Sequence, residues 1–99
     1  MFLAVSRFKV KNNMQEEVKE AFSRRPHLVD NVAGFFDMEV YIPQDDDSEF
    51  WLLTRWTDES AFHAWHKSEA HHISHKGIPK GLKLDPSATF VRYFDKIAD

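Results

Sequence analysis

The stretch FFDMEVYIPQDDDSEFWLLTRW at residues 35–56 decides the fold that this sequence predicts. Residues 35–42 and 49–56 are rich in aromatic and aliphatic side chains, which is typical of β-strands. Pro43 stops the first run, and the acidic tip at residues 45–48 turns the chain into the second run. Because no helix lies between the two runs, we expect them to pair as an antiparallel hairpin.

The segment before this hairpin predicts one strand and one helix. Residues 2–10 alternate between two faces, as a half-buried strand does. Asn12 or Asn13 can cap a helix that begins near Met14, with two carboxylates in its first turn. Pro26 ends or kinks this helix.

The remaining segments complete a ferredoxin-like pattern. Residues 27–32 predict a short helical turn. After the hairpin, Thr57 or Asp58 caps a helical path that continues, with or without a break, to His75. A loop over residues 76–86 then leads into a last strand over residues 87–97. The order β-α-β-β-α-β predicts an α+β fold in which an antiparallel sheet carries both helices on one face.

The composition bounds the class of protein. A chain of 99 residues fits one domain, over residues 1–99. A net charge of -3 and a pI near 6.0 give no general attraction to nucleic acid or to an anionic membrane. The chain has no cysteine and its N-terminal apolar run is short, so we expect a cytoplasmic protein without a disulfide or thiolate site.

The strands carry apolar side chains on both faces. On the first strand, Leu3 and Val5 lie opposite Phe2 and Phe8. Two helices can cover only one face of the sheet, and the other would remain as a large exposed apolar patch. We therefore expect a homodimer that buries sheet against sheet.

The region after the hairpin offers candidate site residues. Trp65 and His75 are ten residues apart, which on one continuous helix is about three turns, so both can reach one cavity. Ser6 would point toward Trp65 if the helices cover the face of Phe2 and Phe8. A neutral imidazole at position 75 is a good ligand for a transition metal or haem iron. The structural alternatives are a packing serine and a core tryptophan.

Other charged or metal-binding patterns are weaker. His71 and His75 have the i, i+4 spacing that chelates zinc, but no third ligand is evident. Arg24 and Arg25 form a basic pair that can hold a carboxylate, although exposed arginines are common at helix ends. No serine lies in a glycine-flanked nucleophile elbow, and the three glycines are too few for a phosphate-binding loop.

The string WTDESAFHAWHKSEAHHISH at residues 56–75 resembles the antibiotic-biosynthesis-monooxygenase superfamily, and specifically its haem-degrading (IsdG-like) branch. The residues that carry the resemblance are Trp56, Ala61, Phe62, Trp65, Ser68 and His75. The resemblance covers nearly the whole chain, and it implies a single domain of this family that assembles as a dimeric α+β barrel.

The same resemblance implies roles for five residues. His75 would be the axial ligand to haem iron, and Trp65 would press on the porphyrin and distort it. Phe22 would line the pocket, and Arg25 would contact a propionate. Ser6 occupies the strand position that is typically Asn in this branch, where the side chain donates a hydrogen bond near the iron. A serine is shorter and has a single donor.

The implied activity is haem degradation, with haem as both substrate and cofactor. The porphyrin ring would be opened with dioxygen and electrons from an external donor or reductase, and iron would be released. Two alternatives stay open. The first is a cofactor-independent monooxygenase acting on a quinol or a polyketide aromatic, and the second is a haem-binding protein without catalytic activity.

Overall fold

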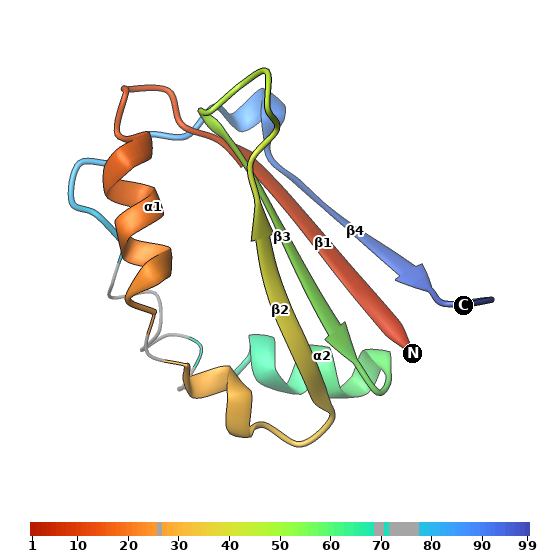
Figure 1. Cartoon of the computed structure of the whole chain (residues 1–99). Helices are drawn as coiled ribbons and strands as arrows, with labels where there is room; N and C mark the ends of the chain where they lie inside the picture. Colours follow the sequence, from red (N-terminus) through yellow and green to blue (C-terminus); the bar gives the residue numbers. More distant parts are fainter. Residues whose placement is uncertain (26, 69–70, 72–77) are drawn as a thin grey trace.

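The computed structural model describes residues 1–25, 27–68, 71 and 78–99 (Figure 1). Its elements are β1 (Phe2–Lys9), α1 (Gln15–Ser23), the 3-10 turn η1 (Leu28–Asn31), β2 (Phe35–Tyr41), β3 (Glu49–Trp56), α2 (Glu59–His66), the 3-10 turn η3 (Pro86–Ala88) and β4 (Phe90–Asp95). The four strands form one antiparallel sheet in the order β2-β3-β1-β4, which confirms the predicted ferredoxin-like arrangement. In the described ranges, no helix is long and apolar enough to cross a membrane.

The strand register places the core on one face of the sheet. Phe2 lies opposite Trp56 and Phe8 opposite Phe50, so these aromatic side chains share the face that the helices cover. One core cluster consists of Phe2, Ala4, Val29, Trp56 and Trp65, and a second consists of Val10, Val18 and Phe50. The first cluster joins the sheet to α2 and η1, and the second joins it to α1.

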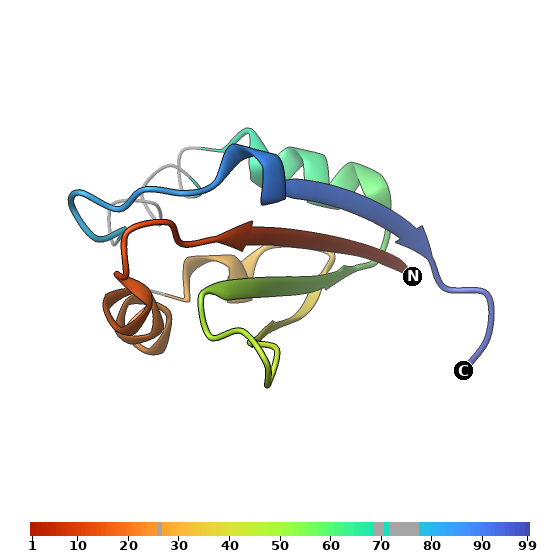
Figure 2. The ribbon, with the colours of Figure 1, turned by 90° about the horizontal axis from the view of Figure 1, so that it is seen from above.

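The two helices lie at different ends of this face. In Figure 1, α1 runs beside one half of the sheet, while α2 crosses its opposite end. The turned view of Figure 2 shows α1 nearly end on, beside the end of β1 that leads into it. The separation of the helices matches the separation of the two core clusters.

The helix after the hairpin is shorter than a continuous path to His75 requires. Asp58 is its N-cap, as predicted, and accepts a hydrogen bond from the Ala61 amide at 2.9 Å. The helix ends at His66, and the Ser68 hydroxyl then donates to the Trp65 carbonyl at 2.7 Å. The version of the prediction with one unbroken helix from Asp58 to His75 is therefore wrong, and the version with a break stays a prediction. His75 itself lies outside the described residues.

The predicted cap of α1 is also wrong. The N-cap residue is Met14, which makes no side-chain capping bond. Asn13 has a positive φ of 61°. The Asn12 amide instead donates to the Gly81 carbonyl at 2.7 Å and accepts from the Lys83 amide at 3.3 Å. Asn12 thus ties the connection between β1 and α1 to the segment over residues 78–84.

The last strand is shorter than the predicted range of residues 87–97. Its start is delayed because η3 forms first, with the Asp85 carboxylate accepting from the Ser87 amide at 3.0 Å. Just before this turn, Leu84 forms an isolated antiparallel bridge with Val10. The segment over residues 78–84 therefore runs alongside the end of β1.

Gly34 lies close against α2. It has a φ of +84°, and a Cβ atom added there would lie 2.6 Å from the Ala61 Cβ. Gly81 has a similar φ of +81°, but an added Cβ there meets nothing within 4 Å. The two glycines therefore share the backbone requirement and differ in packing.

We expect Gly34→Ala to destabilise the protein more than Gly81→Ala. Both variants incur the strain of an L-residue at positive φ, about 1–2 kcal/mol. Only Gly34→Ala adds a clash, which costs a further ~1–3 kcal/mol. Denaturant unfolding of both variants measures the difference, and equal free energies of unfolding would contradict this account of the packing.

The hairpin tip contains a carboxylate with a strongly lowered pKa. Hydrogen bonds from the Ser48 side chain and backbone, and then from Lys9, bring the pKa of Asp46 to about 2. Its contribution to stability is therefore present above the unfolded pKa of about 3.9 and is lost as the pH falls through about 2.

We expect Asp46→Asn to be less stable than the natural sequence at neutral pH. The difference between the two should shrink as the pH falls from about 4 to about 2, because the natural carboxylate is then protonated. Thermal unfolding over this range tests the prediction. A difference that does not vary with pH would show that the charge of Asp46 is not responsible.

Candidate functional site

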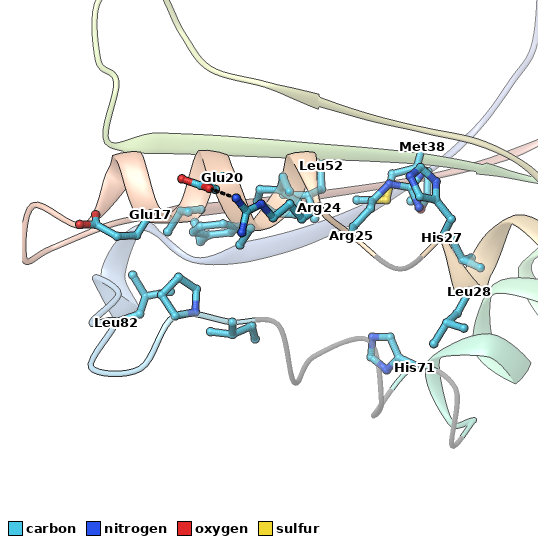
Figure 3. A pocket seen from close by; sticks show the side chains of 18 of the residues that line it. Glu17, Glu20, Arg24, Arg25, His27, Leu28, Met38, Leu52, His71 and Leu82 are labelled. Carbon is cyan, nitrogen blue, oxygen red and sulfur yellow. Dashed lines mark ion pairs between the residues drawn. The ribbon is translucent and has the colours of Figure 1, made fainter.

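A cavity of about 880 Å³ opens between the sheet, α1 and the segment over residues 78–84 (Figure 3). Its volume lies toward the upper end of the ~300–1,000 Å³ that small-molecule sites span. Its floor is formed by sheet residues from three strands: Phe8, Met38, Leu52 and Thr54. In Figure 3, α1 forms one side, and Leu82, His71 and Leu28 lie on the opposite side.

The walls of the cavity are mainly apolar. Residues from α1, η1, α2 and the segment over residues 78–84 contribute Val18, Ala21, Phe22, Leu28, Val29, Trp65, Ile78, Pro79, Leu82 and Leu84. Such a lining removes apolar surface of a ligand from water and gives it little specific polar contact. The cavity therefore suits a ligand with a large apolar body.

Trp65 is both a core residue and a wall of this cavity. Its side chain is 9% exposed and packs with Phe2 and Trp56. The His71 ring meets the Trp65 ring edge-on, with centroids 5.4 Å apart, and both residues line the cavity. The sequence offered two interpretations of Trp65, a core residue or a residue that reaches a cavity, and in the structure it is both.

Phe22 also lines the cavity, from α1. Its ring centroid lies 6.3 Å from that of Phe8 and 6.2 Å from that of Phe50. Val18, one turn earlier, is 3% exposed and anchors the same side of the helix. Packing against the sheet therefore fixes the aromatic ring of Phe22 at the edge of the cavity.

The polar rim of the cavity carries two arginines, and each has a carboxylate partner. Arg24 pairs with Glu20 at 2.7 Å, as the dashed line in Figure 3 shows. Arg25 donates to the Asp30 carboxylate at 3.2 Å, and the His27 Nδ1 lies 3.0 Å from the other Asp30 oxygen. Sequence reasoning identified the arginines but not Asp30, whose place on η1 only the folded chain reveals.

Asp30 is the common partner of two residues at the rim. Burial raises its pKa, but hydrogen bonds from His27 and Arg25 outweigh that effect, so the pKa of this carboxyl lies below its usual value. Asp30 is therefore ionised at neutral pH and holds Arg25, whose side chain is 22% exposed, against the cavity.

Ser6 lies on the expected face of the sheet, but it does not line the cavity. Its neighbours across the ladder are Leu52 on β3, which does line the cavity, and Val91 on β4, which does not. The residue that β1 contributes to the floor of the cavity is Phe8. The hydroxyl among the floor residues is that of Thr54, which sequence reasoning missed because nothing in the local pattern separates it from other strand residues.

The histidines fall into different environments. His63 pairs with Glu59 at 3.1 Å, and the rings of His66 and His71 are 4.6 Å apart. His72 and His75 are not among the described residues. Within the described ranges, no three histidine, aspartate or glutamate side chains gather as a metal site.

Solved structures with the same fold include a haem degrader and an oxygenase. The haem degrader MhuD from Mycobacterium tuberculosis, with two hemes bound in its active site, aligns with a TM-score of 0.79 at 21% identity and covers 100% of this chain and 98% of that one. SnoaB, a cofactor-independent oxygenase from Streptomyces nogalater, aligns with a TM-score of 0.78 at 18% identity and covers 99% and 94%.

Curated relatives are more similar in sequence. The heme-degrading monooxygenase HmoA of Bacillus subtilis is 31% identical over 85 residues, which are 81% of this chain and 78% of that protein. A mycobilin-producing heme oxygenase of M. tuberculosis is 29% identical over 65 residues. That alignment takes in 64% of this chain and only 62% of the relative's length.

The model of one protein family, described as antibiotic biosynthesis monooxygenase, matches residues 1–77. This range includes β1, both helices, the hairpin and most of the residues that line the cavity. The chain therefore belongs to the antibiotic biosynthesis monooxygenase family.

Proposed function

We propose that this protein is a haem-degrading monooxygenase, which opens the porphyrin with dioxygen and external electrons and releases iron. The single observation that carries the proposal is the cavity of about 880 Å³, which has apolar walls and arginines at its rim. The named activities of the relatives from B. subtilis and M. tuberculosis support the same substrate.

The residues that are present fit the chemistry of haem. The flat apolar part of the ligand matches walls such as Phe22 and Trp65, and its carboxylates match the rim. Arg25 has five N–H donors, of which a hydrogen bond to Asp30 uses one. The guanidinium can therefore keep Asp30 and still hold a propionate.

Each wall residue has a task in this proposal. Trp65 is fixed between the sheet and His71, so it can press on a bound ring without moving away. Phe22 and the residues of the segment 78–84 exclude water from the ligand. His75 would hold the haem iron, on the strength of the family pattern. When bound, haem supplies the chemistry of dioxygen activation, and the protein supplies orientation and a dry pocket.

A second candidate function is cofactor-independent oxygenation of a flat aromatic substrate. The observation that favours it is electrostatic. Arg24 and Arg25 already pair with Glu20 and Asp30, and Glu17 also lines the cavity, so the rim carries little uncompensated positive charge for a dianionic ligand. A haem-binding protein without turnover is the third candidate, and Ser6 in place of the usual asparagine supports it.

The proposed partners are a second copy of this chain and an external reductant. Leu3, Val5, Trp51, Leu53 and Phe94 lie on the sheet face opposite the helices. Arg55 on this face is held by Asp37 at 3.0 Å and also by Glu39, and Arg7 donates to the Ala88 carbonyl at 2.9 Å. Because Arg55 and Arg7 already have partners within the chain, a two-fold partner that covers this face leaves neither of them as an isolated buried charge.

We expect Leu53→Glu to convert the dimer to a monomer, because it places an unpaired charge in the centre of the covered face. Ala33→Glu, in the exposed turn before β2, adds the same charge elsewhere and serves as the control. Sedimentation equilibrium gives the mass of each. A dimer that survives Leu53→Glu would exclude this face as the interface.

We expect hemin titration to shift the Soret band and to saturate at one haem per chain. His75→Ala should abolish the shift. His63→Ala should leave it intact, because His63 pairs with Glu59 and neither residue lines the cavity. A reductant such as ascorbate should then bleach the Soret band and release iron that a ferrous chelator captures.

The same titration separates the three candidates. A stable Soret band under reductant and dioxygen would identify haem binding without turnover. The absence of hemin binding at micromolar concentration would exclude both haem candidates and leave the organic aromatic substrate.

A further inference from the structure

The floor of the cavity contains a hydroxyl that a ligand can contact, that of Thr54. Thr54 lies on β3, opposite Ala4 on β1 and Met38 on β2, and it lines the cavity together with Met38 and Leu52. Its neighbours along the helix-covered face of β3 are Leu52 and Trp56, so its hydroxyl is set among apolar side chains.

The Thr54 hydroxyl is available to a ligand. It is half-buried, and it makes no side-chain hydrogen bond to any residue in the described part of the chain. A hydroxyl has one donor and two acceptor lone pairs, and it is costly to bury without a partner. A ligand that fills the cavity and displaces water must therefore offer the hydroxyl a polar atom or leave it unsatisfied.

Thr54 differs from the polar residues at the rim of the cavity in the element that carries it. Ala4 is small and 2% exposed, so it supports Thr54 from β1 without covering it. The polar side chains of the rim, which are Glu17, Glu20, Arg24, Arg25 and His27, come from α1 and the segment that follows it. Thr54 is the hydroxyl that the sheet presents to the cavity in the described chain.

We propose that Thr54 is a ligand-contacting residue, and that its hydroxyl donates a hydrogen bond to an oxygen atom, of the ligand or of a water bound to it, on the side of the ligand that faces the sheet. In this role it replaces Ser6 on β1. Ser6 lies opposite Leu52, the next residue along the same face of β3, and it does not line the cavity. The proposal rests on the proposed function, since it takes haem as the ligand in the cavity.

The test compares Thr54→Val, Thr54→Ser and Ser6→Ala with the natural sequence. Valine keeps the branched shape and removes the hydroxyl, whereas serine keeps the hydroxyl and removes a methyl group. Three quantities are measured: the hemin dissociation constant, the visible spectrum of the hemin complex, and the rate of Soret decay under reductant. Thermal unfolding verifies that each variant is folded.

We expect Thr54→Val to lower the rate of Soret decay under reductant by about tenfold, because the variant loses one hydrogen bond to the reacting ligand. We also expect it to change the visible spectrum of the hemin complex. Thr54→Ser and Ser6→Ala should stay within about threefold of the natural rate, a margin that ordinary hydrogen-bond and packing differences span. Rescue by serine is the result that a purely structural role of Thr54 would not give.

The outcomes separate this inference from the proposed function. If the natural protein fails to bind hemin, both fail. If it binds hemin but Thr54→Val matches it in affinity, spectrum and rate, only the inference is overturned. The same holds if Ser6→Ala gives the loss, or if valine and serine are equally defective. If the natural protein binds hemin without degrading it, an altered spectrum in Thr54→Val that serine restores supports the inference, and an unaltered one overturns it.

Discussion

Large aromatic side chains at the two ends of the β1–β3 ladder set the spacing between the sheet and its helices. Phe2 pairs with Trp56 at one end, and Phe8 pairs with Phe50 at the other. Trp56 and Phe50 are fully buried, and each belongs to a different core cluster. The rows between them contain smaller side chains, among them Ala4 and Ser6. On β3, Leu52 and Thr54 lie between these two aromatic rows and line the cavity, so its floor runs from one core cluster towards the other.

The elements around the cavity supply different kinds of side chain: the sheet supplies a mainly apolar floor, and the helical segments supply the charges at the rim. The sheet is pinned by its ladders and offers a floor with little freedom to move. The charges at the rim come from α1 and η1, where Asp30 connects Arg25 and His27. A ligand therefore meets a fixed apolar floor and a rim of ion pairs that can exchange partners. A surface ion pair contributes little to stability, about 0–1 kcal/mol, so such an exchange costs the fold little.

The fold could be predicted from sequence because its signals are local. Alternation in residues 2–10, the hairpin in residues 35–56 and the Asp58 cap each depend on neighbours in the chain. The site was harder to predict because its members meet only in the folded chain. Asp30 and Thr54 sit on separate elements and carry no motif of their own. The sequence left open whether the path after Asp58 is broken, because helical periodicity does not report that the Ser68 hydroxyl competes for the Trp65 carbonyl at the end of α2.

Trp65 links the stability of the fold to the shape of the site. Its indole is 9% exposed, and it belongs to the core cluster that holds α2 and η1 on the sheet. Removing such a side chain typically costs 3–5 kcal/mol, a large part of the stability of a small domain, so truncating it cannot separate a catalytic role from a structural one. The same burial gives the wall its rigidity, because the ring cannot turn away from a ligand without opening the core. Because Trp65 packs the core and lines the cavity with the same side chain, a chain of 99 residues needs no separate layer of residues to support this wall.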